Sequence, residues 1–160
     1  MKDFMIALAK NRIDLAVRAV RKTPSILKDH DNNLWTPLHH AAFEQEENLV
    51  QLIISYKPDF NAKNIYGNTA LHIACEMGSR RIVKLLTRAG ANPNIQNYEG
   101  VAPLHIAAEN NEIRIADILI TAVAMVNIRD SNRKTPLAYA RDAESHEIAK
   151  FIQQNGGKIK

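Results

Sequence analysis

Histidine and cysteine side chains stand close together in two similar stretches, and they are the residues most able to do chemistry. The sequence reads TPLHHAA from Thr36 to Ala42 and TALHIAC from Thr69 to Cys75. A His beside a Cys can generate a thiolate nucleophile, and several imidazoles together can bind zinc. Either chemistry requires that the elements carrying these residues let the side chains converge.

The stretch that begins at Thr36 recurs every 33 residues along the chain. The four copies begin at Thr36, Thr69, Ala102 and Thr135 and read TPLH, TALH, APLH and TPLA. Other residues keep the same phase: Asn61, Asn94 and Asn127, Gly67 and Gly100, and the apolar pairs Leu52–Ile53, Leu85–Leu86 and Ile118–Leu119. A repeat of this length indicates a stack of small units that bury a common core.

Each unit contains two predicted helices and a turn-rich segment. TPLHHAAFEQ predicts a short helix with Thr36 as its N-cap and Pro37 in its first position. ENLVQLIISY has apolar residues at helical spacing and predicts a second helix. KPDFNAKNIYGN is rich in turn-forming residues. No single unit can bury its own apolar face, so we expect an all-α stack.

The period and the TPLH pattern resemble the ankyrin repeat. The unit from Asn64 to Gln96 is similar to that family's repeat nearly end to end. The resemblance implies an ankyrin-repeat solenoid of helix-turn-helix units joined by hairpin turns, in one domain over residues 1–160. Its expected parts are a divergent N-terminal capping repeat (1–30), full repeats (31–63, 64–96 and 97–129) and a C-terminal capping repeat (130–160).

Several residues depart from the repeated pattern. Leu34 and Arg133 stand where the other units have the hairpin glycine, so altered turns are expected there. Ala102 replaces the capping Thr and removes a hydroxyl worth about 1 kcal/mol. Val123 stands where the third unit has Gly90, which predicts the loss of a left-handed helix stop.

The repeat gives the histidines and the cysteine an architectural interpretation. The resemblance implies that His39, His72 and His105 bond the capping Thr and the neighbouring backbone, tying one unit to the next. Equivalent positions in a stack form a row and cannot converge on a zinc ion at about 2.1 Å, so no metal is expected. Cys75 is in phase with alanines and is expected to be buried, and His40 to be partly buried. The chain has no phosphate loop, nucleophile elbow, HExxH or CxxC, which predicts neither an enzyme nor a cofactor.

The resemblance places partner contacts on a concave face made by the hairpin tips and the exposed side of the first helices. The predicted protein-binding residues are Trp35, Phe43, Glu44, Ile65, Tyr66, Glu76, Met77, Tyr98, Val101 and Glu109. Exposed Trp and Tyr are typical of binding hot spots. The acids, continued by Asp142, predict an acidic ladder suited to a partner with an apolar anchor flanked by Lys or Arg. Alternatively, Trp35 shields the turn at Leu34, and Tyr66 and Tyr98 stack on one another.

Charge and composition limit the possible partners. The net charge is +4, and the excess lies in residues 1–30, which hold seven Lys or Arg against three acids. Basic residues lack interleaved aromatics or a recognised motif, which argues against nucleic-acid binding. A single Cys, the absence of a signal-like N-terminus and the lack of a run of about 20 apolar residues predict an intracellular, cytoplasmic monomer without a membrane span. The nucleus, or the host cytosol for an effector, stays open as the compartment.

These observations predict a non-catalytic protein-protein interaction module, acting as a scaffold, adaptor or inhibitor. Three alternatives stay open at this point. In the first, the chain is a targeting domain of a larger protein; in the second, it is a host-directed effector of an intracellular microbe. In the third, it binds nucleic acid or acidic surfaces through residues 1–30. A composition rich in Asn, Ile and Lys fits the second, and a steep salt dependence of binding would support the third.

Overall fold

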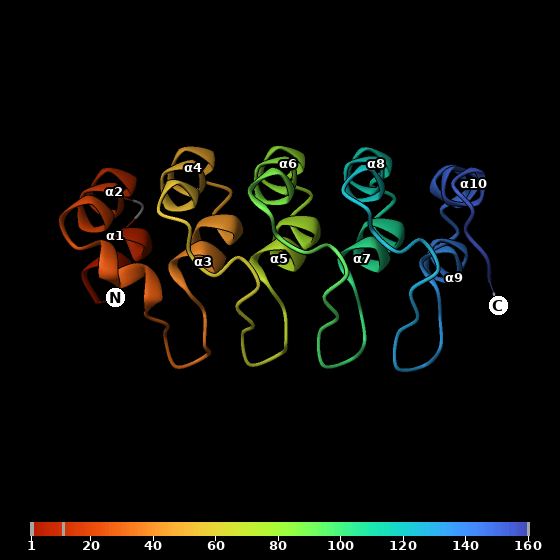
Figure 1. Ribbon diagram of the computed structural model, residues 1–160, viewed down its shortest axis with the longest axis horizontal. Coiled ribbons are helices and arrows are strands. Elements are labelled where there is room, and N and C mark those ends of the chain that lie inside the picture. The colour runs from red at the N-terminus through yellow and green to blue at the C-terminus, as the bar shows by residue number, and fades with distance from the viewer. Residues whose placement is uncertain (1, 11, 160) are drawn as a thin grey trace.

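The computed structural model describes residues 2–10 and 12–159, and within them the chain forms ten α-helices, one 3₁₀ helix and no strand. The helices pair in chain order, and the pairs stand in a row with the two termini at opposite ends (Figure 1). The pairs are α1 (Lys2–Ala9) with α2 (Ile13–Lys22), α3 (Pro37–Phe43) with α4 (Glu47–Ser55), α5 (Ala70–Glu76) with α6 (Arg80–Ala89), α7 (Pro103–Glu109) with α8 (Ile113–Thr121), and α9 (Pro136–Asp142) with α10 (His146–Gln154). The 3₁₀ helix η1 (Pro24–Lys28) follows the first pair. The predicted all-α class is confirmed.

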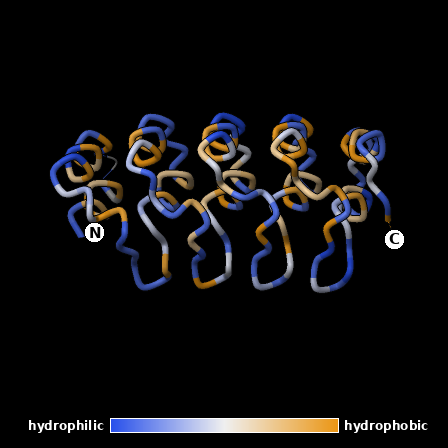
Figure 2. The backbone as a smooth tube through the Cα atoms, viewed as in Figure 1, coloured by the Kyte–Doolittle hydropathy of each residue, from blue (hydrophilic) through white to orange (hydrophobic). Residues whose placement is uncertain are grey.

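The helices form two layers, and hairpin loops project beyond one of them. In Figure 1, α4, α6, α8 and α10 make one layer, while α3, α5, α7 and α9 lie between that layer and the hairpins. Figure 2 shows hydrophobic and hydrophilic residues on different sides of the helices. The hydrophobic sides meet in a continuous core that includes Leu71, Ile82, Leu86 and Leu104. Burying each such side chain stabilises the fold by about 1.5–3 kcal/mol.

The first helix of each full unit begins where its sequence predicts. Thr36 is extended, with ψ of 165°, and Pro37 occupies the first helical position of α3. Proline suits this position because its missing N–H would have no partner inside the helix. The same arrangement opens α9 at Thr135 and Pro136.

The hairpin turns keep one conformation even where glycine is absent. Leu34 and Arg133 have φ of 57° and 65°, in the left-handed region that Gly67 also occupies with φ of 80°. The expectation of altered turns is therefore wrong. The same side-chain bonds hold every hairpin: Asp31 Oδ1 accepts the backbone N–H groups of residues 33 and 35 at 2.8 and 2.9 Å, as Asn64 and Asn97 do in the hairpins that keep glycine. Asp130 makes the same pair of bonds to residues 132 and 134.

The loop after α8 also keeps its left-handed residue. Val123 has φ of 61° and takes the role of Gly90, so the predicted loss of the helix stop is wrong. A left-handed conformation costs a residue with a Cβ about 1–2 kcal/mol. Asn94 of the preceding unit holds this loop in place: its Nδ2 donates to the Val123 carbonyl at 3.1 Å, and its Oδ1 accepts from Met125 N at 2.6 Å.

Asparagines in phase with Asn94 hold the neighbouring loops in the same way. Asn61 Oδ1 accepts from Asn92 N at 3.0 Å, and Asn127 Oδ1 accepts from Lys158 N at 2.6 Å. We call this contact the asparagine clamp, formed by Asn61, Asn94 and Asn127. It explains why an asparagine repeats at this position.

Candidate functional site

The three repeated histidines connect each unit to the next. The Nε2 atoms of His39, His72 and His105 donate to backbone carbonyls of the following unit, at 3.0, 3.1 and 3.1 Å. Each Nδ1 accepts a backbone N–H at 3.1 Å from the residue that precedes its helix. A carbonyl only accepts and an N–H only donates, so each imidazole is neutral with its proton on Nε2. The predicted role of these histidines is confirmed.

Burial keeps these imidazoles neutral. It lowers the pKa of all three, and it lowers the pKa of His72 to about 4. The protonated form would also bring a second N–H, on Nδ1, against a backbone N–H. Within the described residues, no three His, Cys, Asp or Glu side chains gather as a metal site requires. Catalysis by the thiol is disfavoured, because Cys75 is fully buried and burial raises its pKa.

Helix α7 is preceded by Ala102, so its N-cap has no side-chain hydroxyl. The Oγ1 atoms of Thr36 and Thr69 lie 2.8 Å from the Nδ1 of their histidines. At Ala102 only the backbone N–H reaches His105 Nδ1, at 3.1 Å. Helix α7 forms nonetheless, with the hydroxyl contact missing as predicted.

Exposed apolar side chains occupy successive hairpin tips and the end of α3. The predicted binding residues that are exposed lie at the hairpin tips and at the C-terminal ends of α3, α5 and α7. We call them the recognition face: Phe43, Glu44, Ile65, Tyr66, Glu76, Tyr98 and Glu109. Tyr66 is 62 % exposed and Tyr98 67 %. The tips are joined by backbone hydrogen bonds, from Ile65 N to Asn33 O at 3.1 Å and from Tyr98 N to Tyr66 O at 3.1 Å. Exposed side chains are therefore carried on a fixed backbone.

The ring of Tyr98 is held in place from two sides. A Cβ on Gly67 would lie 2.6 Å from Tyr98 N and 2.9 Å from its Cδ1, so only glycine fits beneath the tyrosine. Lys63 Nζ lies 5.6 Å from the ring centroid and donates to Gln96 O at 2.8 Å. Among the ring contacts of the described residues, none joins Tyr66 to Tyr98. The alternative in which these tyrosines stack on each other does not occur.

Trp35 is half-buried and packs on α3. Its ring centroid lies 5.1 Å from that of His40 and 5.6 Å from that of Phe43, which it meets edge to face. The expectation that Trp35 is exposed is therefore wrong. Its ring contacts are with side chains of α3, and Phe43 stays exposed beside the indole.

Two predicted binding residues lie deeper than their register suggested. Val101 is only 9 % exposed, its N–H donates to Asn97 Oδ1 at 2.9 Å, and its carbonyl accepts from His72. Met77 is half-buried against the core. The expectation that both are exposed is wrong. The position of a residue within the repeat predicts which part of the unit it belongs to, but not how deeply its side chain is buried.

The acidic residues form a shorter ladder than expected. Glu76, Glu109 and Asp142 are the last residues of α5, α7 and α9, but Glu44 lies one residue later in its own unit. Asp142 is paired, with its Oδ2 2.6 Å from Lys134 Nζ on the surface. Of the ion pairs among described residues, none includes Glu76 or Glu109, so these two form the unpaired part of the ladder.

Sequence reasoning missed a pairing rule inside the hairpins. Where the hairpin begins with Asp, its second oxygen has a partner nine residues on: His40 Nε2 lies 3.1 Å from Asp31 Oδ2, and Tyr139 Oη donates to Asp130 Oδ2 at 3.0 Å. The two units that begin with Asn have isoleucine at that place. Burial lowers the pKa of His40, partly offset by Asp31, and burial with the Asp130 contact raises that of Tyr139. The sequence contains this signal: wherever Asp replaces Asn at the start of the hairpin, His or Tyr replaces Ile nine residues later.

Stacked helix pairs tied by histidines, asparagine clamps and bonded hairpin tips define a helical repeat solenoid. A family model of ankyrin repeats (three copies) matches residues 4–97 and 83–160, and the chain belongs to this family. Repeats of the family are generally protein–protein interaction modules and are typically non-catalytic. In the described part of the chain, no helix is long and apolar enough to cross a membrane.

Proposed function

We propose that this protein is a non-catalytic binding module that holds a protein partner on the recognition face, as a scaffold, adaptor or inhibitor. The observation that carries the proposal is the pair Tyr66 and Tyr98, which expose most of their surface at consecutive tips. Tyrosine is enriched among the residues that dominate binding energy. Neither ring fills the core of the fold, so binding is the role that accounts for them.

The geometry supports tight binding because little has to be ordered on association. The tip backbones are already bonded to one another, and Tyr98 is fixed between Gly67 and Lys63. Preorganisation reduces the entropy lost when a complex forms. The exposed Glu76 and Glu109 lie on the same face and favour a partner with Lys or Arg beside its apolar anchor.

The test is affinity capture from a lysate of the source cells followed by mass spectrometry. Wild-type protein is compared with Tyr66→Ala/Tyr98→Ala, which truncates the two exposed rings. Both side chains are mostly exposed, so the variant should keep its helical circular dichroism spectrum. We expect the partner recovered by the wild type to be lost from the variant.

The matched control is Val123→Ala/Met125→Ala. These residues are also exposed and apolar, but they lie on the loop after α8, away from the hairpin tips. The control should recover the same partner as the wild type. Equal recovery by the tyrosine variant, with its fold intact, would show that the recognition face is not the binding site.

A further inference from the structure

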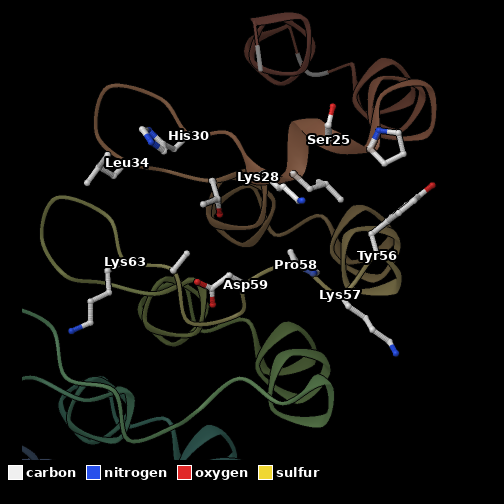
Figure 3. A pocket seen from close by; sticks show the side chains of 13 residues that line it. Ser25, Lys28, His30, Leu34, Tyr56, Lys57, Pro58, Asp59 and Lys63 are labelled. Atoms are coloured by element: carbon white, nitrogen blue, oxygen red, sulfur yellow. The ribbon is translucent and has the colours of Figure 1, made fainter.

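Outside the recognition face, a groove lies at the first junction of the stack. It has a volume of about 790 Å³ and lies between η1 with the following hairpin and the loop after α4. Figure 3 shows η1 on one side of the groove and the segment from Tyr56 to Lys63 on the other. None of the three repeated histidines lines it, and it shares no residue with the recognition face.

The groove is present where the asparagine clamp is missing. At the later junctions, a clamp side chain accepts the backbone N–H of Asn92, Met125 or Lys158. The residue in phase at the first junction is Lys28, which has no acceptor on its side chain. Within the described residues, no hydrogen bond joins Lys28 to Asp59, the residue in phase with Asn92. The loop after α4 is therefore not drawn against the preceding unit.

The lining of the groove includes exposed apolar side chains. Tyr56 and Leu34 are 41 % and 39 % exposed and lie toward opposite ends of the groove (Figure 3), and Pro24 and Pro58 also line it. Leu34 is the residue that replaces a glycine in its hairpin, and its left-handed conformation places a large apolar side chain at this site. Exposed apolar surface of this kind is typical of a binding groove.

The rim is cationic. Lys28, Lys57 and Lys63 line the groove, and Asp59 is its one acid. Asp59 Oδ1 already accepts from Asn61 N at 2.9 Å, and Lys63 is engaged with the following unit. Of the ion pairs among described residues, none includes Lys28 or Lys57. Both lysines are exposed, so their charge is available to an anionic ligand.

We propose that this groove binds an acidic peptide segment of a protein, with an apolar side chain against Tyr56 and carboxylates at Lys28 and Lys57. The basic excess of residues 1–30 draws such a segment toward this end of the stack. Glu76 and Glu109 on the recognition face repel it. The two surfaces therefore select partners of opposite charge. Binding at the groove does not require the function proposed above.

Fluorescence anisotropy of the full chain tests the proposal. The probe is a blocked, fluorescein-labelled peptide in which a Leu-Phe pair is flanked on both sides by glutamates. The variant Lys28→Glu/Lys57→Glu reverses both free cations, and Arg80→Glu/Lys84→Glu makes the same charge change on α6, away from the groove. All four side chains are exposed, so both variants should fold as judged by circular dichroism.

We expect the wild type and the α6 variant to bind the probe equally, and the groove variant to bind at least about tenfold more weakly, or about 1.4 kcal/mol. A peptide with lysines in place of the glutamates should not displace the probe, because the charge of the recognition face, not of the groove, suits it. Failure of the wild type to bind the probe, or equal binding by the groove variant, would overturn the proposal. The proposal would also be overturned if a peptide with Gly-Gly in place of Leu-Phe bound as tightly as the probe and inorganic pyrophosphate displaced the probe. The groove would then recognise charge alone.

Discussion

Protonation of His72 should destabilise the fold as the pH falls below neutrality. The imidazole accepts a backbone N–H at Nδ1 and donates to the Val101 carbonyl from Nε2, so the native state has no place for a second proton. Burial lowers its pKa from 6.5 to about 4 in the folded protein. The unfolded chain binds the proton near pH 6.5, so acid favours the unfolded state.

The magnitude follows from the two pKa values. The stabilisation is present in full above pH 6.5 and is lost as the pH falls toward 4, where the total loss reaches about 3 kcal/mol. Between pH 7 and pH 5, linkage gives a loss of about 2 kcal/mol for His72 alone. His39 and His105 have pKa values lowered by the same cause, so they act in the same direction.

Urea unfolding at pH 7 and pH 5 measures this loss in the wild type and in His72→Gln. Glutamine does not titrate, and its amide can donate to the Val101 carbonyl. The pH-dependent fall in unfolding free energy should therefore be about 2 kcal/mol smaller in the variant. His146→Gln removes an exposed imidazole as a control and should leave the fall unchanged. An equal fall in the wild type and His72→Gln, or an NMR titration of native His72 near pH 6.5, would refute the reasoning.

Three further predictions concern the backbone and the thiol. Replacing Val123, which is 79 % exposed in a left-handed conformation, by Asn should raise the melting temperature by about 2–4 °C; a lower melting temperature would contradict the strain argument. Gly67→Ala should cost at least about 2 kcal/mol in urea unfolding, because the new Cβ meets Tyr98 N. Gly78→Ala should cost only about 1–2 kcal/mol for the left-handed backbone, because φ is 65° but the nearest atom ends a flexible side chain; equal costs would count against the packing at Gly67. Cys75 should react with a thiol reagent only after unfolding, and rapid labelling of the native protein would show that its thiol is accessible to solvent.

The repeating residues allowed the fold to be predicted because each has one structural task in every unit. Thr36 with Pro37 opens a helix, His72 bonds the next unit, and a small residue at Cys75 lets neighbouring helices approach. These tasks depend on local chemistry and on contact with an identical neighbour. A residue type that recurs every 33 residues therefore indicates both the helix it belongs to and the contact it makes with the neighbouring unit.

The conformation of the irregular turns was not predictable from one residue at a time. Leu34 replaces a glycine, yet the turn survives because Asp31 accepts two backbone N–H groups and His40 satisfies its second oxygen. The turn is specified by several residues that vary together, and only the folded chain brings them to one place. The burial of Val101 was missed for the same reason. It is in phase with Trp35, Asn68 and Lys134, of which only Lys134 is exposed, and its backbone bonds Asn97 and His72.

The most direct test of the central claim is the dissociation constant of the captured partner, measured by calorimetry for the wild type and for Tyr66→Ala/Tyr98→Ala. Two hot-spot tyrosines of about 2 kcal/mol each should weaken binding by roughly a hundredfold or more, with an unchanged melting temperature. An affinity within about twofold of the wild type, in a variant that melts at the same temperature, would contradict the assignment of the recognition face.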